Sequence, residues 1–310
     1  MVRNMKRYLL LILTATFLMV QTLYAKSLDD LFLYSTAYIK NKSTNSAGTG
    51  FLVQRWVGDN KIVMYLISNK HVIYPAPLNK KNKDHSAVAE IDINTSEDDK
   101  IKKTSFVITL RNKSGKTYVK GHQNQNVDVA AIVISEQVEQ PPGMFYAIPE
   151  DRFATKDFIK SYYISVGDRA IIIGYPLNLV EQGHVTPVAR NAIIATKPDE
   201  NFKNLPAFLV DGTVMRGSSG SPVILPVRPN VWTEKHKVDV FKIQQNHIIG
   251  IAKGHIKDWE LTIRKTVALG KAQEFTIVDN SQLGLVFTAD TILDVINSFK
   301  YKKWNKKKDK

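Results

Sequence analysis

A run of small residues in the second half of the chain has the composition of a turn that presents a nucleophile. The segment Met215–Pro222 reads Met-Arg-Gly-Ser-Ser-Gly-Ser-Pro and lies between apolar stretches. Gly217 and Gly220 permit a tight turn whose backbone N–H groups approach a ligand closely. As a nucleophile, Ser219 would need a base, a group that orients the base, and backbone donors for an oxyanion. A Gly/Ser turn between two strands is also a common structural element, so this segment alone leaves both interpretations open.

Two upstream segments contain the groups that such a serine requires. His71 follows the end of the apolar strand predicted at Ile62–Ser68, and Asp128 stands at the head of the apolar strand predicted at Val127–Ile134. A histidine can accept the serine proton, and a carboxylate can fix the histidine tautomer. Taken singly, the two residues are equally explained as a turn histidine and a strand-end carboxylate. The catalytic interpretation depends on all three residues occurring together.

The chain order His, Asp, Ser and the sequence around each residue resemble the chymotrypsin-like (trypsin-type) serine protease family. His71 stands in the family's strand-end turn, Asp128 opens an Asp-hydrophobic-Ala strand, and Ser219 stands in a Gly-x-Ser-Gly-Ser-Pro segment. Further segments resemble exported bacterial trypsin-like peptidases, and they are Gly48–Val53, Ala170–Pro176, Val185–Ala195 and Ile248–Ala252. These ordered landmarks cover roughly residues 35–290, which is most of the chain.

The resemblance implies a fold and a mechanism. The implied fold class is all-β, with two packed antiparallel β-barrels and a C-terminal helix. In the implied mechanism of peptide hydrolysis, Asp128 orients His71, and His71 takes the proton of Ser219 as an acyl-enzyme forms. The backbone N–H groups of Gly217 and Ser219 would bind the oxyanion. The position of the zymogen-type acid is occupied by Ser218, so activation through a newly cut N-terminus is not expected.

The resemblance also indicates candidates for the substrate pocket, and these are Thr213, Lys253 and His255. None is acidic, which argues against a preference for Lys or Arg in the substrate. No metal or organic cofactor is expected, because the remaining histidines form no recognisable cluster of metal ligands. The expected partner is a protein or peptide substrate.

The first 25 residues have the organisation of a secretory signal peptide. Arg3, Lys6 and Arg7 precede the largely apolar run Tyr8–Val20, and small and apolar residues lead to Ala25. The alternative is an uncleaved membrane anchor, although the run is shorter than the roughly 20 apolar residues that a spanning helix needs. We therefore expect export, to the periplasm or the medium, with cleavage near Ala25.

The remaining chain is expected to divide into two barrels with short flanking segments. The predicted division is 1–25 signal peptide, 26–140 N-terminal barrel, 141–165 connection, 166–300 C-terminal barrel and helix, and 301–310 basic tail. Strand-length runs rich in β-branched and aromatic residues occur at Leu33–Ile39, Gly50–Trp56, Ile62–Ser68, Ala87–Ile93, Ser105–Arg111, Val127–Ile134, Ala170–Gly174, Val185–Arg190, Ala192–Ala195, Ala207–Asp211, Ser221–Leu225, Ile248–Ala252 and Gly284–Phe287.

Three other segments complete this prediction. The charged stretch Asn94–Lys103 is predicted to be a solvent loop. Residues Thr291–Phe299 have the apolar spacing of an amphipathic helix, with Asp290 or Thr291 as its N-cap. The polar insertion Pro226–Asn246 matches no expected element.

Composition limits the function classes. The chain has no cysteine, so disulfides and thiolate chemistry are excluded, and its 44% hydrophobic content suffices for a core. The formal charge of +14 is concentrated in lysine-rich loops and in the tail 301–310. No nucleic-acid motif accompanies it, so solubility or a weak contact of the tail with an anionic surface explains the excess. The oligomeric state is not determined by the sequence.

Three functional hypotheses follow. The first is an exported serine endopeptidase. The second is a catalytically silent trypsin-like fold that acts as a binding module in the cell envelope. The third is a basic envelope-associated protein whose tail binds an anionic polymer, with the barrels as a scaffold.

Overall fold

The computed structural model describes residues 28–58, 61–77, 85–97, 100–138, 144–180, 185–212, 214–228, 231–232, 238–239, 244–266 and 272–300. The predicted signal peptide, the basic tail and Thr213 lie outside these residues. Within them, none of the helices combines the length and the apolar character that a membrane crossing requires. The fold is all-β with a C-terminal helix, which confirms the predicted fold class.

The first unit is a nine-stranded sheet in the order β5-β4-β1-β2-β3-β7-β6, with β8 beside β4 and β9 beside β2. An isolated bridge between Arg111 and Thr117 joins β5 to the segment that leads into β6. The strands of this unit are β1 Thr36–Asn41, β2 Ser46–Val57, β3 Lys61–Ser68, β4 Ala87–Glu97, β5 Lys100–Arg111, β6 Lys120–Gly121, β7 Ala130–Val133, β8 Met144–Phe145 and β9 Ile148–Pro149.

The second unit is a closed barrel in the order β10-β11-β12-β17-β16-β13. Closure leaves no exposed sheet edge within the barrel, since each strand has two neighbours. Its strands are β10 Arg169–Gly174, β11 Val188–Ile194, β12 Ala207–Asp211, β13 Pro222–Leu225, β16 His247–Thr266 and β17 Ala272–Thr288. The short pair β14 Val231–Trp232 and β15 Val238–Asp239 lies in the insertion that the sequence left unassigned.

Short helices connect and cover the two units. They are α2 Asp30–Tyr34, α3 Lys70–Ile73, η1 Glu150–Arg152, α4 Lys156–Ser161, η2 Pro176–Asn178 and α5 Ala289–Asn297. The predicted C-terminal helix is therefore present, but it begins two residues earlier, after Thr288 in the extended N-cap position. Its buried face includes Ile292, Val295 and Ile296.

The three largest apolar clusters of the described residues form the core of the molecule. One fills the interior of the first unit and includes Leu52, Leu66 and Ile132, and another fills the second barrel and includes Ile172 and Phe208. The third cluster takes residues from both units and from α5, and its members include Val53, Tyr65, Ile171, Ile224, Ile248 and Ile292. The two units thus share a core, and α5 packs against it.

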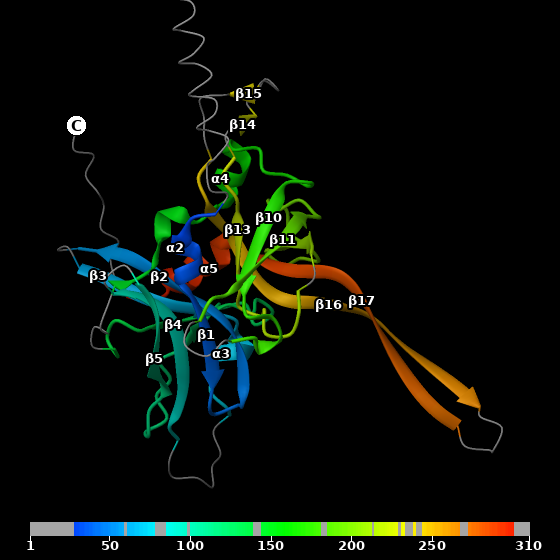
Figure 1. Cartoon of the computed structure of the whole chain (residues 1–310), viewed down its shortest axis with the longest axis horizontal. Helices are drawn as coiled ribbons and strands as arrows, with labels where there is room; N and C mark the ends of the chain where they lie inside the picture. Colours follow the sequence, from blue (N-terminus) through cyan, green and yellow to red (C-terminus); the bar gives the residue numbers. More distant parts are fainter. Residues whose placement is uncertain are drawn as a thin grey trace, which may run out of the picture.

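Strands β16 and β17 run far beyond the barrel as a two-stranded arm, which projects away from the rest of the molecule in Figure 1. Their pairing continues from Gly250↔Thr288 to Thr266↔Ala272, with register shifts near Gly254 and Lys257. The sequence predicted only the barrel ends of these strands, so the arm is an addition to the expected architecture.

Two further expectations were wrong. Asn94–Lys103 is not a solvent loop, because β4 continues to Glu97 and pairs with β5 from Lys100 onward. Leu33 and Tyr34 belong to α2 instead of a strand, and the helix is capped by the Asp29 carboxylate, which accepts from the Leu31 amide at 3.0 Å. Cross-strand pairing overrides the charged local pattern in the first case, and a helix cap overrides the apolar pattern in the second.

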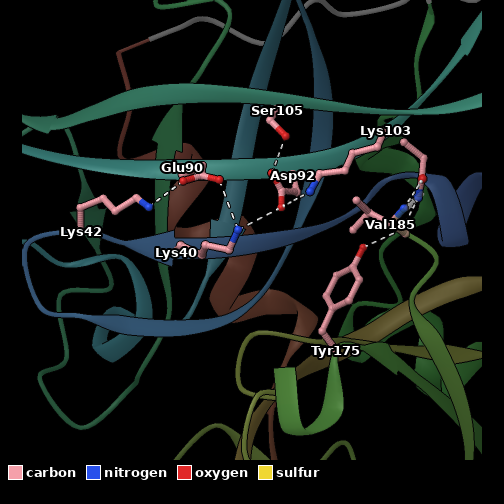
Figure 2. Close-up of polar contacts among 9 residues, drawn as sticks. Lys40, Lys42, Glu90, Asp92, Lys103, Ser105, Tyr175 and Val185 are labelled. Atoms are coloured by element: carbon pink, nitrogen blue, oxygen red, sulfur yellow. Dashed lines mark hydrogen bonds and ion pairs between the residues drawn. The ribbon is translucent and has the colours of Figure 1, made fainter. Parts of the chain in front are cut away.

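A charged network covers β1, β4 and β5 beside the contact between the two units (Figure 2). The buried carboxylate of Asp92 lies 3.4 Å from Lys40 Nζ and 3.0 Å from Lys103 Nζ, and it accepts from Ser105. Burial raises the pKa of Asp92, but the hydrogen bonds from Ser105 and Lys103 and the lysine charges together hold this pKa below its usual value. The buried carboxylate of Asp92 is thus paired with two lysine ammonium groups.

Beside this network, Tyr175 of the second unit reaches into the first (Figure 2). Its buried hydroxyl lies within hydrogen-bonding distance of the carbonyl oxygens of Thr36, at 3.2 Å, and Val185, at 3.1 Å. The Val185 backbone is held in turn by the amide side chain of Asn94 on β4. The two units are therefore joined by specific polar contacts as well as by the shared core.

Candidate active site

The first part of the site forms where β3 ends. Asn69 is the extended N-cap of α3, and the one-turn helix that follows contains His71. The Asn69 side chain does not cap this helix; instead its Nδ2 donates to the main-chain carbonyl of Asp128 at 2.6 Å. Asn69 lies two residues before His71. Its buried side chain therefore fixes the backbone of Asp128 next to the segment that carries the histidine.

Both carboxylate oxygens of Asp128 contact His71. Oδ2 lies 2.6 Å from the ring Nδ1, and Oδ1 accepts from the His71 backbone N–H at 3.2 Å. An ionised carboxylate only accepts hydrogen bonds, so the ring proton belongs on Nδ1 and the lone pair on Nε2. The His71 side chain is 49% exposed and that of Asp128 only 13%. In this arrangement Nδ1 of His71 faces Asp128, and Nε2 of the half-exposed ring can accept a proton.

The charge state of Asp128 follows from its surroundings. Burial raises the pKa of its carboxyl group, but the hydrogen bonds from His71 and the positive charges of His71 and Lys253 outweigh that effect and hold the pKa below its usual value. Asp128 is therefore ionised at neutral pH and can stabilise a protonated imidazole.

Lys70 ties the segment before Asp128 to the same helix. Its Nζ donates to the carbonyl oxygens of His122, at 2.9 Å, and Asn124, at 3.0 Å. Burial lowers the pKa of Lys70, and the negative charge of Asp128 acts in the opposite direction. The loop that carries Asp128 is thus anchored on α3 from two sides, by Asn69 and by Lys70.

Ser219 lies where the two units meet. Its carbonyl accepts from the Thr49 amide of β2 at 2.9 Å, and its Oγ donates to the carbonyl of Lys253 on β16 at 2.9 Å. The next residue, Gly220, has φ +88°, and a methyl group there would overlap the carbonyl oxygen of Thr49 and crowd Ser68 Oγ. Since Ser68 ends β3 three residues before His71, these contacts bring the serine turn against the end of the strand that carries the histidine.

The segment before Ser219 forms a type II turn. The Ser218 N–H donates to the Met215 carbonyl at 3.0 Å, and Gly217 has φ +91° at the third position, which that turn type requires. The Arg216 carbonyl accepts from the Leu177 N–H at 2.6 Å. In a planar trans peptide the following N–H points the opposite way, so the Gly217 N–H is directed away from Leu177.

In the described part of the chain, the N–H groups of Gly217 and Ser219 donate to no acceptor. Two free backbone donors that flank a serine hydroxyl are the elements of an oxyanion site. Thr49 holds this turn from the first unit, because its Oγ1 donates to the Gly217 carbonyl at 2.8 Å and accepts from the Tyr175 N–H at 3.0 Å.

The structure therefore brings His71 and Asp128 into direct contact and places Ser219 in the adjoining turn. The Ser219 hydroxyl donates a hydrogen bond to the backbone carbonyl of Lys253. Of the pocket candidates, Lys253 borders Ser219 through its carbonyl and has an exposed side chain. His255 belongs to β16, and Thr213 lies outside the described residues. Across the described residues, no group of three or more His, Asp and Glu side chains could hold a metal ion.

Sequence reasoning missed three supports of this site, which are Thr49, Asn69 and Lys70. The neighbouring pair Asn69-Lys70 directly precedes His71, and that adjacency is a signal that polar side chains lie near the histidine. Thr49 gave no comparable signal, because its partners lie 126 and 168 residues further along the chain.

Comparison with known protein families identifies the family to which the chain belongs. Residues 48–227 match the family described as trypsin-like peptidase domain, so the chain belongs to the trypsin-like peptidase family. Among solved structures, "Crystal structure of Deg5" is 17% identical, with 73% of this chain and 83% of that chain covered and a TM-score of 0.41. The human heparin binding protein is 9% identical, with 88% and 94% covered and a TM-score of 0.44. No curated protein matches the sequence.

Proposed function

We propose that this protein is a serine endopeptidase in which Ser219 attacks a peptide carbonyl, with His71 as general base and Asp128 as the group that orients it. The observation that carries the proposal is the double contact between Asp128 and His71, because it fixes the ring with its basic nitrogen free. Membership of the trypsin-like peptidase family supports the assignment of roles.

In the proposed reaction, Ser219 transfers its proton to Nε2 of His71 as its oxygen bonds to the carbonyl carbon. The negative charge that develops on the carbonyl oxygen would be stabilised by the N–H groups of Gly217 and Ser219. His71 then gives the proton to the leaving amine, and water hydrolyses the acyl-enzyme by the same route. The ionised Asp128 stabilises the imidazolium at each stage.

The experiment that tests this function uses a fluorophosphonate probe and a peptide library with the purified full chain. Labelling and cleavage by the wild type should both vanish in Ser219→Ala and in His71→Ala. Ser165→Ala, which changes an exposed serine outside the site, should behave as the wild type. A folded wild type that neither reacts with the probe nor cleaves any peptide contradicts the proposal.

One observation favours a second candidate, a trypsin-like fold that binds without cleaving. The Ser219 hydroxyl donates to the Lys253 carbonyl, and a serine held there would have to turn toward His71 before it reacts. A binding module would retain affinity for a peptide ligand, unchanged in Ser219→Ala, while the wild type shows no turnover.

We also propose that the chain is exported and processed near Ala25, as the charged, apolar and small-residue order at its start predicts. Mass determination of the protein recovered outside the cytoplasm should give a mature chain that begins near Lys26. Recovery of the full-length chain in a membrane fraction would instead indicate an anchor. A weak contact of the basic tail with an anionic surface is tested by vesicle binding of the chain with and without residues 301–310 at rising salt.

A further inference from the structure

Two exposed leucines stand beside the turn that supplies the proposed oxyanion donors. Leu177 is 60% exposed and Leu179 is 59% exposed. Both belong to the turn around η2, which leaves the end of β10 after Tyr175. The turn is closed by two hydrogen bonds of its own, from Asn178 N–H to the Tyr175 carbonyl and from Leu179 N–H to the Pro176 carbonyl, each 3.1 Å.

This turn packs directly on the oxyanion turn. The Leu177 N–H donates to the Arg216 carbonyl at 2.6 Å, so a direct hydrogen bond joins the two segments. A methyl group added to Gly217 would overlap the Tyr175 carbonyl oxygen and lie 2.9 Å from the Asn178 nitrogen. Leu177 is therefore attached beside the Arg216–Gly217 peptide, whose N–H, on the side away from Leu177, is the proposed oxyanion donor.

The backbone of this turn is in an unfavourable conformation. Leu177 has φ 56° and ψ 19°, and Asn178 also has φ 56°, so both lie in the left-handed region. Asparagine is common there, whereas leucine is not. Strained residues that persist in a folded protein concentrate at ligand sites. A leucine that accepts this strain and still leaves most of its side chain in solvent has no role in the core.

We propose that Leu177, assisted by Leu179, is a specificity-determining residue that contacts an apolar side chain of the substrate adjacent to the scissile bond. This inference rests on the proposed function, since it names the substrate class of the same site. Contact with an aliphatic or aromatic substrate residue would remove the exposed leucine surface from water, and a polar residue at that position would gain nothing.

The test compares cleavage rates of peptides that differ at one position. Each position within three residues of the scissile bond is varied among Leu, Phe, Ser and Asn, and kcat/KM is measured for the purified full chain. At one of these positions the wild type should prefer Leu or Phe over Ser by about tenfold or more, the usual discrimination of a small apolar contact.

The informative variant is Leu177→Asn, because asparagine adopts the left-handed conformation readily and is polar. This variant should keep the thermal unfolding midpoint of the wild type and lose about fivefold or more of the preference for Leu over Ser. Leu177→Met, which restores an apolar side chain, should retain the preference. The matched control is Val166→Asn, a 52% exposed apolar residue before the opposite end of β10, which should leave the preference unchanged.

Three outcomes overturn the inference. Leu177→Asn could show the wild-type preference, Val166→Asn could lose it equally, or the wild type could cleave peptides with no apolar preference at any position. A wild type that cleaves no peptide at all is a different result, because it removes the proposed function and this inference together.

Discussion

At the scale of single residues, the Asp128 carboxylate determines what His71 can do. Its two oxygens engage the ring and the backbone of the same residue, at 2.6 Å and 3.2 Å. Asp128→Asn would place an amide opposite Nδ1 and favour the wrong histidine tautomer. We expect kcat to fall by about 10⁴-fold while the fold is retained, measured by peptide hydrolysis and circular dichroism. Retention of most of the activity would show that the Asp128 carboxylate does not set the tautomer of His71.

The same carboxylate predicts a pH dependence of stability. The folded-state pKa of Asp128 lies below its usual value, so its stabilising contribution is present above the unfolded-state pKa of about 3.9. That contribution is lost as the pH falls through the lower folded-state pKa. The difference in free energy of unfolding between the wild type and Asp128→Asn, from urea titrations, should therefore be larger at pH 7 than near pH 2. An equal difference at both pH values contradicts the assigned pKa direction.

Two glycines with nearly equal φ give a matched pair of stability tests. Gly220, with φ +88°, leaves no room for a methyl group beside Thr49, whereas Gly167, with φ +91°, has open space around the same position. Gly167→Ala should cost only the backbone strain, about 1 kcal/mol. Gly220→Ala should cost roughly 3 kcal/mol or more, because the two units must also separate locally. Urea unfolding measures both changes in the free energy of unfolding. Equal losses would mean that the structure around Gly220 and Thr49 relaxes to admit the methyl group.

At the scale of elements, a buried arginine connects three of them. Arg55 of β2 is 1% exposed, and it donates to Glu150 of η1 at 2.6 Å and to Asn297, the last residue of α5, at 2.8 Å. A buried guanidinium without its carboxylate is costly, so Glu150→Gln should destabilise the fold by about 3 kcal/mol. Unfolding in urea tests this, with Glu200→Gln as the control for an exposed ion pair. Equal, small effects of both changes would mean that Arg55 finds another partner.

The sequence predicted most strands, and its errors share a physical cause. Strand-length apolar runs, such as β2, β3 and β10, were found because their own residues predict burial. The polar ends of β4 and β5 were missed because each is held mainly by pairing with the other, from Asn94↔Lys103 to Glu97↔Lys100. The arm of β16 and β17 was missed for the same reason, since cross-strand pairing is invisible in a single segment.

The candidate site could be predicted to the same limit. The types and order of His71, Asp128 and Ser219 indicated the chemistry that we propose, because each lies in a recognisable local segment. The hydrogen bonds of Asn69 and Lys70 that hold the Asp128 loop, and the turn of Leu177 against Arg216, depend on contacts between distant segments. Local patterns identify candidate reacting groups, and tertiary contacts decide how they are held.

At the scale of the whole molecule, one residue of the first unit organises the serine turn of the second. Thr49 is fully buried and uses all of its polar groups. Its N–H donates to the Ser219 carbonyl, its carbonyl accepts from Ser68 Oγ, and its hydroxyl links the Gly217 carbonyl to the Tyr175 N–H. Three of these four bonds cross between the units. The docking of the two units and the shape of the proposed oxyanion turn therefore depend on the same residue, Thr49.

Thr49→Val removes the hydroxyl group and keeps the shape of the side chain. The variant leaves the buried Gly217 carbonyl and Tyr175 N–H without partners, at about 1–3 kcal/mol for each group. We expect a lower free energy of unfolding and a kcat reduced by about tenfold to hundredfold, because the oxyanion turn loses its support from the first unit. Thr49→Ser keeps the hydroxyl and should retain most of both. If Thr49→Val is destabilised yet keeps the wild-type kcat, the turn is held by its own bonds, from Ser218 to Met215 and from Leu177 to Arg216, and the first unit contributes only stability.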